Sequence, residues 1–175
     1  VQSLQSIVSR RITALEPAVV SVTIFDAGSA LNVIPGAARL GGTARSFSPE
    51  IRKLLEESIR DITQSTAKAF DCGVEIDWQP GYPPTVNHAD ESSRAVSVAS
   101  DVLGTENIIT DLPPSMGAED FAFMLGEKPG SYIWLGSGPA KEGAMLHNDG
   151  YDFNDDVLAT GASYWARLVE NELSK

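Results

Sequence analysis

Several residue types on which common functions depend are scarce in this sequence. One cysteine, Cys72, occurs among 175 residues, so no internal disulfide can form, which fits a reducing compartment and predicts a cytoplasmic protein. Lysine and arginine number 13 against 24 acidic residues. The resulting net charge of −11 disfavours binding to nucleic acid or to an anionic membrane. No apolar run approaches the roughly 20 residues that a bilayer-spanning helix requires.

The composition indicates a folded protein, and the chain starts with a helical pattern that lacks a start signal. Hydrophobic residues make up 42% of the chain and charged residues 21%, which is enough to bury a core and excludes wholesale disorder. Apolar residues recur at helical spacing from Leu4 to Leu15, but no cluster of N-cap residues precedes them. We therefore expect the chain to be part of a longer protein.

A pair of strands is predicted after the first helix. Branched residues alternate with others over 19–24, which predicts a strand that stops at 26–28. The segment 32–35 ends in proline and predicts an extended corner. A second strand is predicted over 37–47, with the small residues 41–44 at its centre.

A long helix and a third strand follow. Ser48 is a hydroxyl cap and Pro49 suits a first helical turn, so a helix is predicted from there to about Phe70. We expect Gly73 to end this helix. Apolar and polar residues then alternate over 74–79, which predicts a strand with one solvated face.

Residues 1–79 therefore read as helix, strand, strand, helix, strand. One further strand before the first helix would complete a βαββαβ sandwich, and we expect that strand to precede Val1. The segment 80–84, with three prolines and a glycine, is the predicted boundary between a first domain, 1–80, and a second, 84–175.

Strands and helices alternate in the second domain, which predicts part of an α/β sheet. The uncharged run 131–136 is typical of a buried parallel strand. The remaining predicted elements are a helix over 89–103, a short strand from 108, a helix over 118–125 and a last helix capped by Asn154.

His147 is the first candidate for chemistry, because only two histidines exist. It lies in the loop 146–155, between a predicted strand and a capped helix, where α/β folds place functional residues. It could be a metal ligand or a general base, oriented by a carboxylate such as Asp149 or Asp152. A histidine exposed on a surface loop is the alternative.

Arg45 and Asn32 are candidates on the rim of the first domain. Arg45 is flanked by small residues on a predicted strand, where its planar guanidinium suits recognition of a carboxylate. An arginine that faces water is the alternative.

Two short segments with polar residues have structural explanations as well. Glu119 and Asp120 would favour the dipole of a helix that starts beside them, whereas Gly117 could let the backbone approach a ligand and donate an N–H. His88 precedes a helix, and a solvated histidine at a helix entry is the simpler interpretation.

Five motifs occur in an order that is typical of one family. They are NVIP (32–35), GGTARSF (41–47), MGAEDF (116–121), PGSYIWLG (129–136) and LHNDGYDFND (146–155). In these motifs the chain resembles the C-terminal half of a metal-dependent amidohydrolase of the aminoacylase/carboxypeptidase family, close to hippurate hydrolase and indole-acetyl-amino-acid hydrolase.

The resemblance implies an α/β fold in two parts. Residues 1–80 would be an α+β lid of βαββαβ type that lacks its first strand and forms a homodimer. Residues 84–175 would be the C-terminal part of an α/β catalytic domain of zinc-peptidase type. By the same resemblance His147 is a metal ligand, Asn32 and Arg45 bind the substrate carboxylate, and Gly117 lines the pocket.

The resemblance also implies two divalent ions per intact subunit, which could be zinc, manganese, cobalt or nickel. These ions would activate water to cleave an N-acyl amino acid, while a glutamate from another part of the protein moves the proton. One histidine cannot hold such a pair, so we expect this chain alone to be inactive. A non-catalytic ligand-binding or dimerisation module, or a dipeptidase of the same family, remains the alternative.

Overall fold

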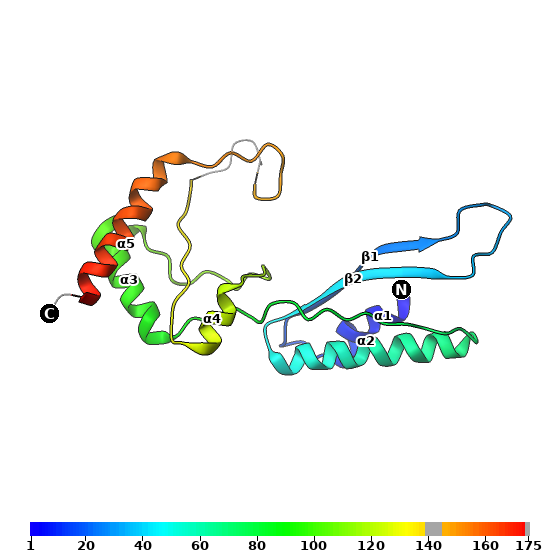
Figure 1. The fold of residues 1–175 in the computed structure, drawn as a ribbon. Helices are drawn as coiled ribbons and strands as arrows, with labels where there is room; N and C mark the ends of the chain where they lie inside the picture. Colours follow the sequence, from blue (N-terminus) through cyan, green and yellow to red (C-terminus); the bar gives the residue numbers. More distant parts are fainter. Residues whose placement is uncertain (139–144, 174–175) are drawn as a thin grey trace. The chain divides into compact units, whose positions relative to one another are not determined.

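The chain forms two units in a computed structural model that describes residues 1–138 and 145–173 (Figure 1). Unit 1 comprises Val1–Pro84 together with Ser115–Glu119. Unit 2 comprises Thr85–Pro114 and Asp120–Lys175. The segment 115–119 therefore belongs by its contacts to unit 1, although the residues on both sides of it belong to unit 2.

Unit 1 contains an antiparallel hairpin of two strands, β1 (Ala18–Ala27) and β2 (Ala38–Ser46). Both strands lie within one or two residues of the predicted positions. Ala18 pairs with Ser46 at one end, and the register shifts between Val22 and Ile24. Thr23 is the extra residue of this bulge. The side chains of β1 beyond it are all exposed, so the alternation of inward-facing and outward-facing residues ends at the bulge.

Gly42 is required by the bulge that lies opposite it. A Cβ atom at this position would lie 2.0 Å from the carbonyl oxygen of Ser21. The small residues predicted at the centre of the second strand therefore permit a close approach of the two backbones.

Helix α2 (Pro49–Ala69) begins at the predicted cap. The Ser48 hydroxyl accepts a hydrogen bond from the backbone N–H of Ile51 at 3.2 Å and donates one to the Glu50 carboxylate at 2.7 Å. The bond from Ser48, with a smaller contribution from the backbone N–H of Glu50, lowers the pKa of the Glu50 carboxyl. The prediction of the helix start is confirmed.

The predicted end of α2 near Phe70 is confirmed, but Gly73 is not the residue that ends the helix. The helix ends at Ala69, where Asp71 adopts a left-handed φ of 55° and the N–H of Cys72 donates to the carbonyl of Ala67 at 2.9 Å. An aspartate can adopt this conformation, so the turn is complete before Gly73 is reached.

The core of unit 1 lies between the hairpin and the helices. Ile7, Val20, Leu55 and Ile62 are buried in it, and Figure 1 shows α2 running along the hairpin. Phe70, at the predicted end of α2, is 78% exposed because it lies beyond the last helical turn. The predicted first helix divides into α1 (Gln2–Ser6) and a π-helical turn, η1 (Ile7–Arg11).

The third strand predicted over 74–79 is not a strand in this structure. No described residue pairs with this segment. A strand needs a neighbouring strand to form hydrogen bonds with its backbone N–H and C=O groups. The segment returns along α2, where the Arg52 guanidinium binds the carbonyls of Gly81 and, at 3.0 Å, Tyr82. Two of the three strands expected in 1–80 are therefore formed.

Unit 2 contains two helices that lie side by side, α3 (Ala89–Leu103) and α5 (Leu158–Leu173) (Figure 1). Ion pairs join them, Arg94 with Glu172 at 3.4 Å and Arg167 with Asp101 at 3.7 Å. The prediction of α3 is confirmed to the residue. Shorter elements are η2 (Thr105–Asn107), α4 (Phe121–Glu127) and η4 (Asp155–Val157).

The strands predicted in unit 2 are absent from the described residues. In place of a neighbouring strand, the Asn87 side-chain amide donates to the Tyr132 carbonyl and accepts from the Tyr132 N–H, both at 2.8 Å. The run 131–136 is consequently open to solvent, and Trp134 is 68% exposed. The segment from 108 likewise has no regular structure.

The helix predictions in unit 2 need two corrections. Helix α4 begins at Phe121, three residues later than predicted, and continues past Gly126. Asn154 does cap the last helical segment, since its side chain accepts from the N–H of Asp156 at 3.1 Å. On α5, Tyr164 is buried, whereas the next residue, Trp165, is 62% exposed.

None of the helices within 1–138 and 145–173 combines the length and the apolar character that crossing a membrane demands.

Candidate functional site

Arg45 and the loop 115–119 come together within unit 1. The Arg45 side chain projects from β2, and its Nη1 donates a hydrogen bond to the carbonyl oxygen of Met116 at 2.9 Å. The two residues are 71 positions apart in the chain. The structure therefore places two sequence candidates, Arg45 and the neighbouring Gly117, beside each other.

The loop has a defined turn at this contact. The Ser115 hydroxyl accepts a hydrogen bond from the backbone N–H of Gly117 at 3.2 Å. A Cβ atom at Gly117 would meet the Ser115 hydroxyl alone, at 3.5 Å. Space is thus open on one side of Gly117, which is exposed.

The charge of Arg45 is not balanced by a carboxylate in the part of the chain that the structure describes. The ion pairs found there involve other basic side chains, and Arg45 takes part in none of them. Its known partner, the carbonyl of Met116, is neutral. A guanidinium has five N–H donors in one plane, so an edge of Arg45 remains for an anion, and a carboxylate fits such an edge with two hydrogen bonds.

Asn32 lies away from this contact. It is exposed in the connection between β1 and β2, near the end of the hairpin where Ala27 pairs with Ala38. Arg45 follows Ala38 by seven positions on β2, a distance of roughly 23 Å along a strand. The structure does not bring Asn32 and Arg45 together within one chain.

His147 lies in unit 2 and has an unusual backbone. Its φ is 66°, in the left-handed region, and the N–H of Asn148 donates to the carbonyl of Met145 at 3.2 Å across it. His147 is therefore the third residue of a β-turn, a position that glycine favours. Its side chain is exposed.

The described residues do not form a metal centre by themselves. Within 1–138 and 145–173, no group of three or more histidine, cysteine, aspartate or glutamate side chains is close enough to share an ion. His147 has Asp149 and Asp152 near it in sequence, but three of the usual protein donors do not converge there. A resident metal pair needs about five ligands, so the residues described do not fit one.

The second histidine, His88, has a structural role. Its Nδ1 accepts a hydrogen bond from the N–H of Gly130 at 3.2 Å, and its own backbone N–H donates to the Gly130 carbonyl at 3.0 Å. This agrees with the structural interpretation of His88 over a catalytic one. The neighbouring Asn87, which binds Tyr132, was not foreseen, because an asparagine before a helix is usually a cap.

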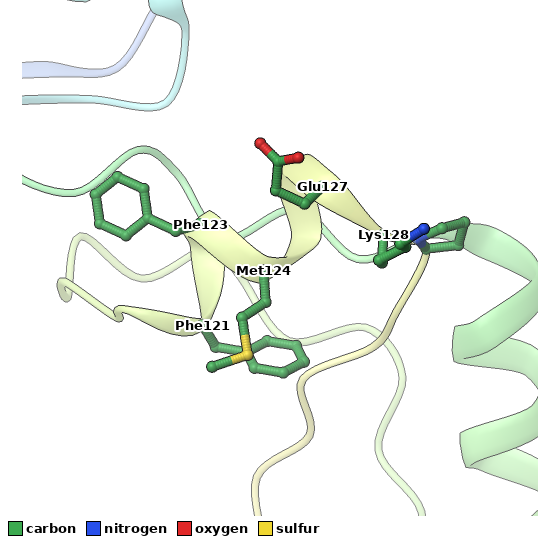
Figure 2. Close-up of a pocket in the computed structure, with 6 residues that line it drawn as sticks. Phe121, Phe123, Met124, Glu127 and Lys128 are labelled. Carbon is green, nitrogen blue, oxygen red and sulfur yellow. The ribbon is translucent and has the colours of Figure 1, made fainter.

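Helix α4 carries a shallow apolar hollow of about 570 Å3. Figure 2 shows Phe121 and Phe123 projecting from the helix in different directions, so its walls do not converge on one space. Glu119 and Asp120 lie before α4 and not in its first turn. Neither of these two carboxylates lines the hollow. Its lining comprises Phe121, Phe123, Met124, Glu127, Lys128 and Pro129.

Comparisons with known proteins give one consistent result. The family profile described as peptidase family M20/M25/M40 matches residues 8–171. Hippurate hydrolase of Campylobacter jejuni is 38% identical over 167 residues, which is 95% of this chain and 43% of that protein. IAA-amino acid hydrolase ILR1-like 4 of Arabidopsis thaliana is 33% identical over 177 residues, covering 98% of this chain and 40% of that protein.

A solved structure agrees with these relatives. The Bacillus subtilis YXEP protein, described as a dinuclear metal binding peptidase from the M20 family, superposes with a TM-score of 0.76 at 27% identity. The match covers all of this chain and 46% of that one. The predicted α/β fold class and the resemblance to amidohydrolases are confirmed. The chain spans less than half the length of the curated relatives it matches.

Proposed function

Because the chain belongs to peptidase family M20/M25/M40, we propose that it is the lid and the C-terminal catalytic part of a metal-dependent amidohydrolase. Its substrate would be an N-acyl amino acid such as hippurate, cleaved at the amide to a carboxylic acid and an amino acid. Hydrolases of related amides are among its relatives.

The contact between Arg45 and the loop 115–119 is the observation that carries this proposal. An N-acyl amino acid has a free carboxylate, and a protein of net charge −11 needs a local positive group to attract it. Arg45 has that charge, no carboxylate partner among the described residues, and open space at the adjacent Gly117. The guanidinium would hold the carboxylate and so orient the amide.

The remaining parts of the proposal concern the intact protein. Two divalent ions, of zinc, manganese, cobalt or nickel, would supply the hydrolytic chemistry, with His147 as one ligand and the other donors outside the described residues. The lid, 1–80, would form a homodimer that brings Asn32 of one subunit to the substrate of the other. The single cysteine favours a cytoplasmic location.

Binding of hippurate to the chain of 175 residues tests the carboxylate site without requiring turnover. We expect hippurate to bind and its uncharged analogue, N-benzoylglycinamide, to bind far more weakly, as measured by NMR titration. Arg45→Ala should weaken hippurate binding roughly tenfold or more, because charge-assisted hydrogen bonds are lost. Hydrolysis is not expected from this chain with any added metal.

Arg39→Ala is the matched control, since Arg39 is an exposed arginine on the same strand and its loss changes the net charge equally. It should leave the hippurate dissociation constant within about twofold of the unchanged chain, because salt screens the effect of a surface charge that does not contact the ligand. Equal weakening by both variants would show a general charge effect and contradict a site at Arg45.

A non-catalytic ligand-binding or dimerisation module is the second candidate. The reading frame before Val1 distinguishes the two, because a hydrolase requires metal-donor motifs there. A dipeptidase of the same family would be separated by its preference in a substrate panel.

A further inference from the structure

The turn at Ser115 controls the direction of the carbonyl group that Arg45 contacts. The Met116 carbonyl and the Gly117 N–H belong to one planar peptide group and point in opposite directions. The Ser115 hydroxyl accepts from that N–H at 3.2 Å, and the carbonyl accepts from Arg45 at 2.9 Å. When Ser115 fixes one end of the peptide plane, the other end is fixed toward Arg45.

We propose that Ser115 is a positioning residue that sets the affinity of Arg45 for a substrate carboxylate. The inference rests on the proposed function of Arg45 and extends it to a residue that does not touch the anion. Ser115 acts through the Met116 carbonyl, which holds one edge of the guanidinium and leaves another edge available.

The physical basis is the conformational freedom of arginine. An exposed arginine side chain loses much of its rotamer entropy when it is fixed in one conformation. Arg45 is exposed and extends from a two-stranded hairpin. The Met116 contact orders its guanidinium before a ligand arrives, so a carboxylate that binds afterwards meets a preorganised donor pair.

The test compares three serine variants of the chain of 175 residues with hippurate as the probe. Ser115→Ala removes the hydroxyl acceptor, and Ser115→Thr keeps it. Ser65→Ala is the matched control, because Ser65 is an exposed serine on α2. Two quantities are measured by NMR: the hippurate dissociation constant, and the rate of rotation of the Arg45 guanidinium from its side-chain N–H signals.

We expect Ser115→Ala to weaken hippurate binding about fivefold, the effect of losing one ordering hydrogen bond, and to speed rotation of the guanidinium. Ser115→Thr should restore both values, and Ser65→Ala should change neither. A change in affinity with unchanged guanidinium rotation would overturn the inference, as would equal affinity in Ser115→Ala and the unchanged chain. Failure of the unchanged chain to bind hippurate at all would instead refute the carboxylate site of the proposed function, and the inference with it.

Discussion

Ser58 on α2 is a polar residue in an apolar environment. It is 1% exposed among the core residues of unit 1, and its hydroxyl has no hydrogen-bond partner among the residues that the structure describes. A buried hydroxyl without a partner loses its interaction with water and gains nothing in exchange. Serine is also a weaker helix former than alanine.

Ser58→Ala should therefore stabilise the chain by about 1 kcal/mol in the free energy of unfolding, measured by urea denaturation and circular dichroism. Ser65→Ala on the same helix gives the contribution of helix propensity alone, because Ser65 is exposed. A gain at Ser58 no larger than the gain at Ser65 would mean that the Ser58 hydroxyl is satisfied in solution.

The hairpin shows how a feature of one strand restricts its neighbour. The bulge at Thr23 turns β1 so that the Ser21 carbonyl lies against Gly42. Arg45 follows three residues later on β2, and the direction of its side chain depends on the register that Gly42 allows. In the hairpin, the need for glycine at position 42 is therefore connected to the orientation of Arg45 in the proposed carboxylate site.

Gly42→Ala should destabilise unit 1 by about 2 kcal/mol or more, since the added methyl group collides with the Ser21 backbone. Gly36→Ala is the control, because a Cβ atom there meets nothing within 4 Å. Urea unfolding compares the two variants, and a Gly42→Ala chain as stable as Gly36→Ala would show that the bulge is absent in solution.

For the molecule as a whole, stability at alkaline pH depends on buried groups that ionise. Burial raises the pKa of the Tyr164 phenol above its ordinary value of 10.0. The folded state therefore holds a neutral phenol that the unfolded chain would ionise first. Its contribution to stability is complete below pH 10.0 and is lost as the pH rises through the raised pKa.

Tyr164→Phe should make the loss of stability above the ordinary tyrosine pKa shallower, as measured by urea midpoints across an alkaline pH series. Tyr151→Phe serves as the control, because Tyr151 is 38% exposed against 8% for Tyr164. Identical pH profiles for Tyr164→Phe and the unchanged chain would mean that the Tyr164 phenol is not buried in solution.

Local signals predicted the elements that depend on local chemistry. The Ser48 cap and the boundaries of α3 follow from residues within one turn of the helix end, and the hairpin follows from alternation in two short runs. The strand predictions at 74–79 and 131–136 failed, because pairing depends on a neighbour that the described residues do not supply.

The candidate site was predictable only in part for the same reason. The sequence identified Arg45 and Gly117 separately, as an arginine among small residues and a glycine before a helix. Their proximity is a tertiary contact across 71 residues, which no local pattern contains. The positions of Asn32 and His147 relative to a substrate stay predictions.

Attempts to isolate the two units by cutting the gene would be affected by the placement of the segment 115–119. A cut after Pro84 gives two contiguous polypeptides, but neither equals a unit, because unit 1 includes Ser115–Glu119. The first polypeptide would leave Arg45 without the Met116 acceptor. The second would contain that acceptor in a segment separated from the rest of unit 1. Domain dissection of this protein therefore calls for grafting the five residues onto the first piece through a designed linker.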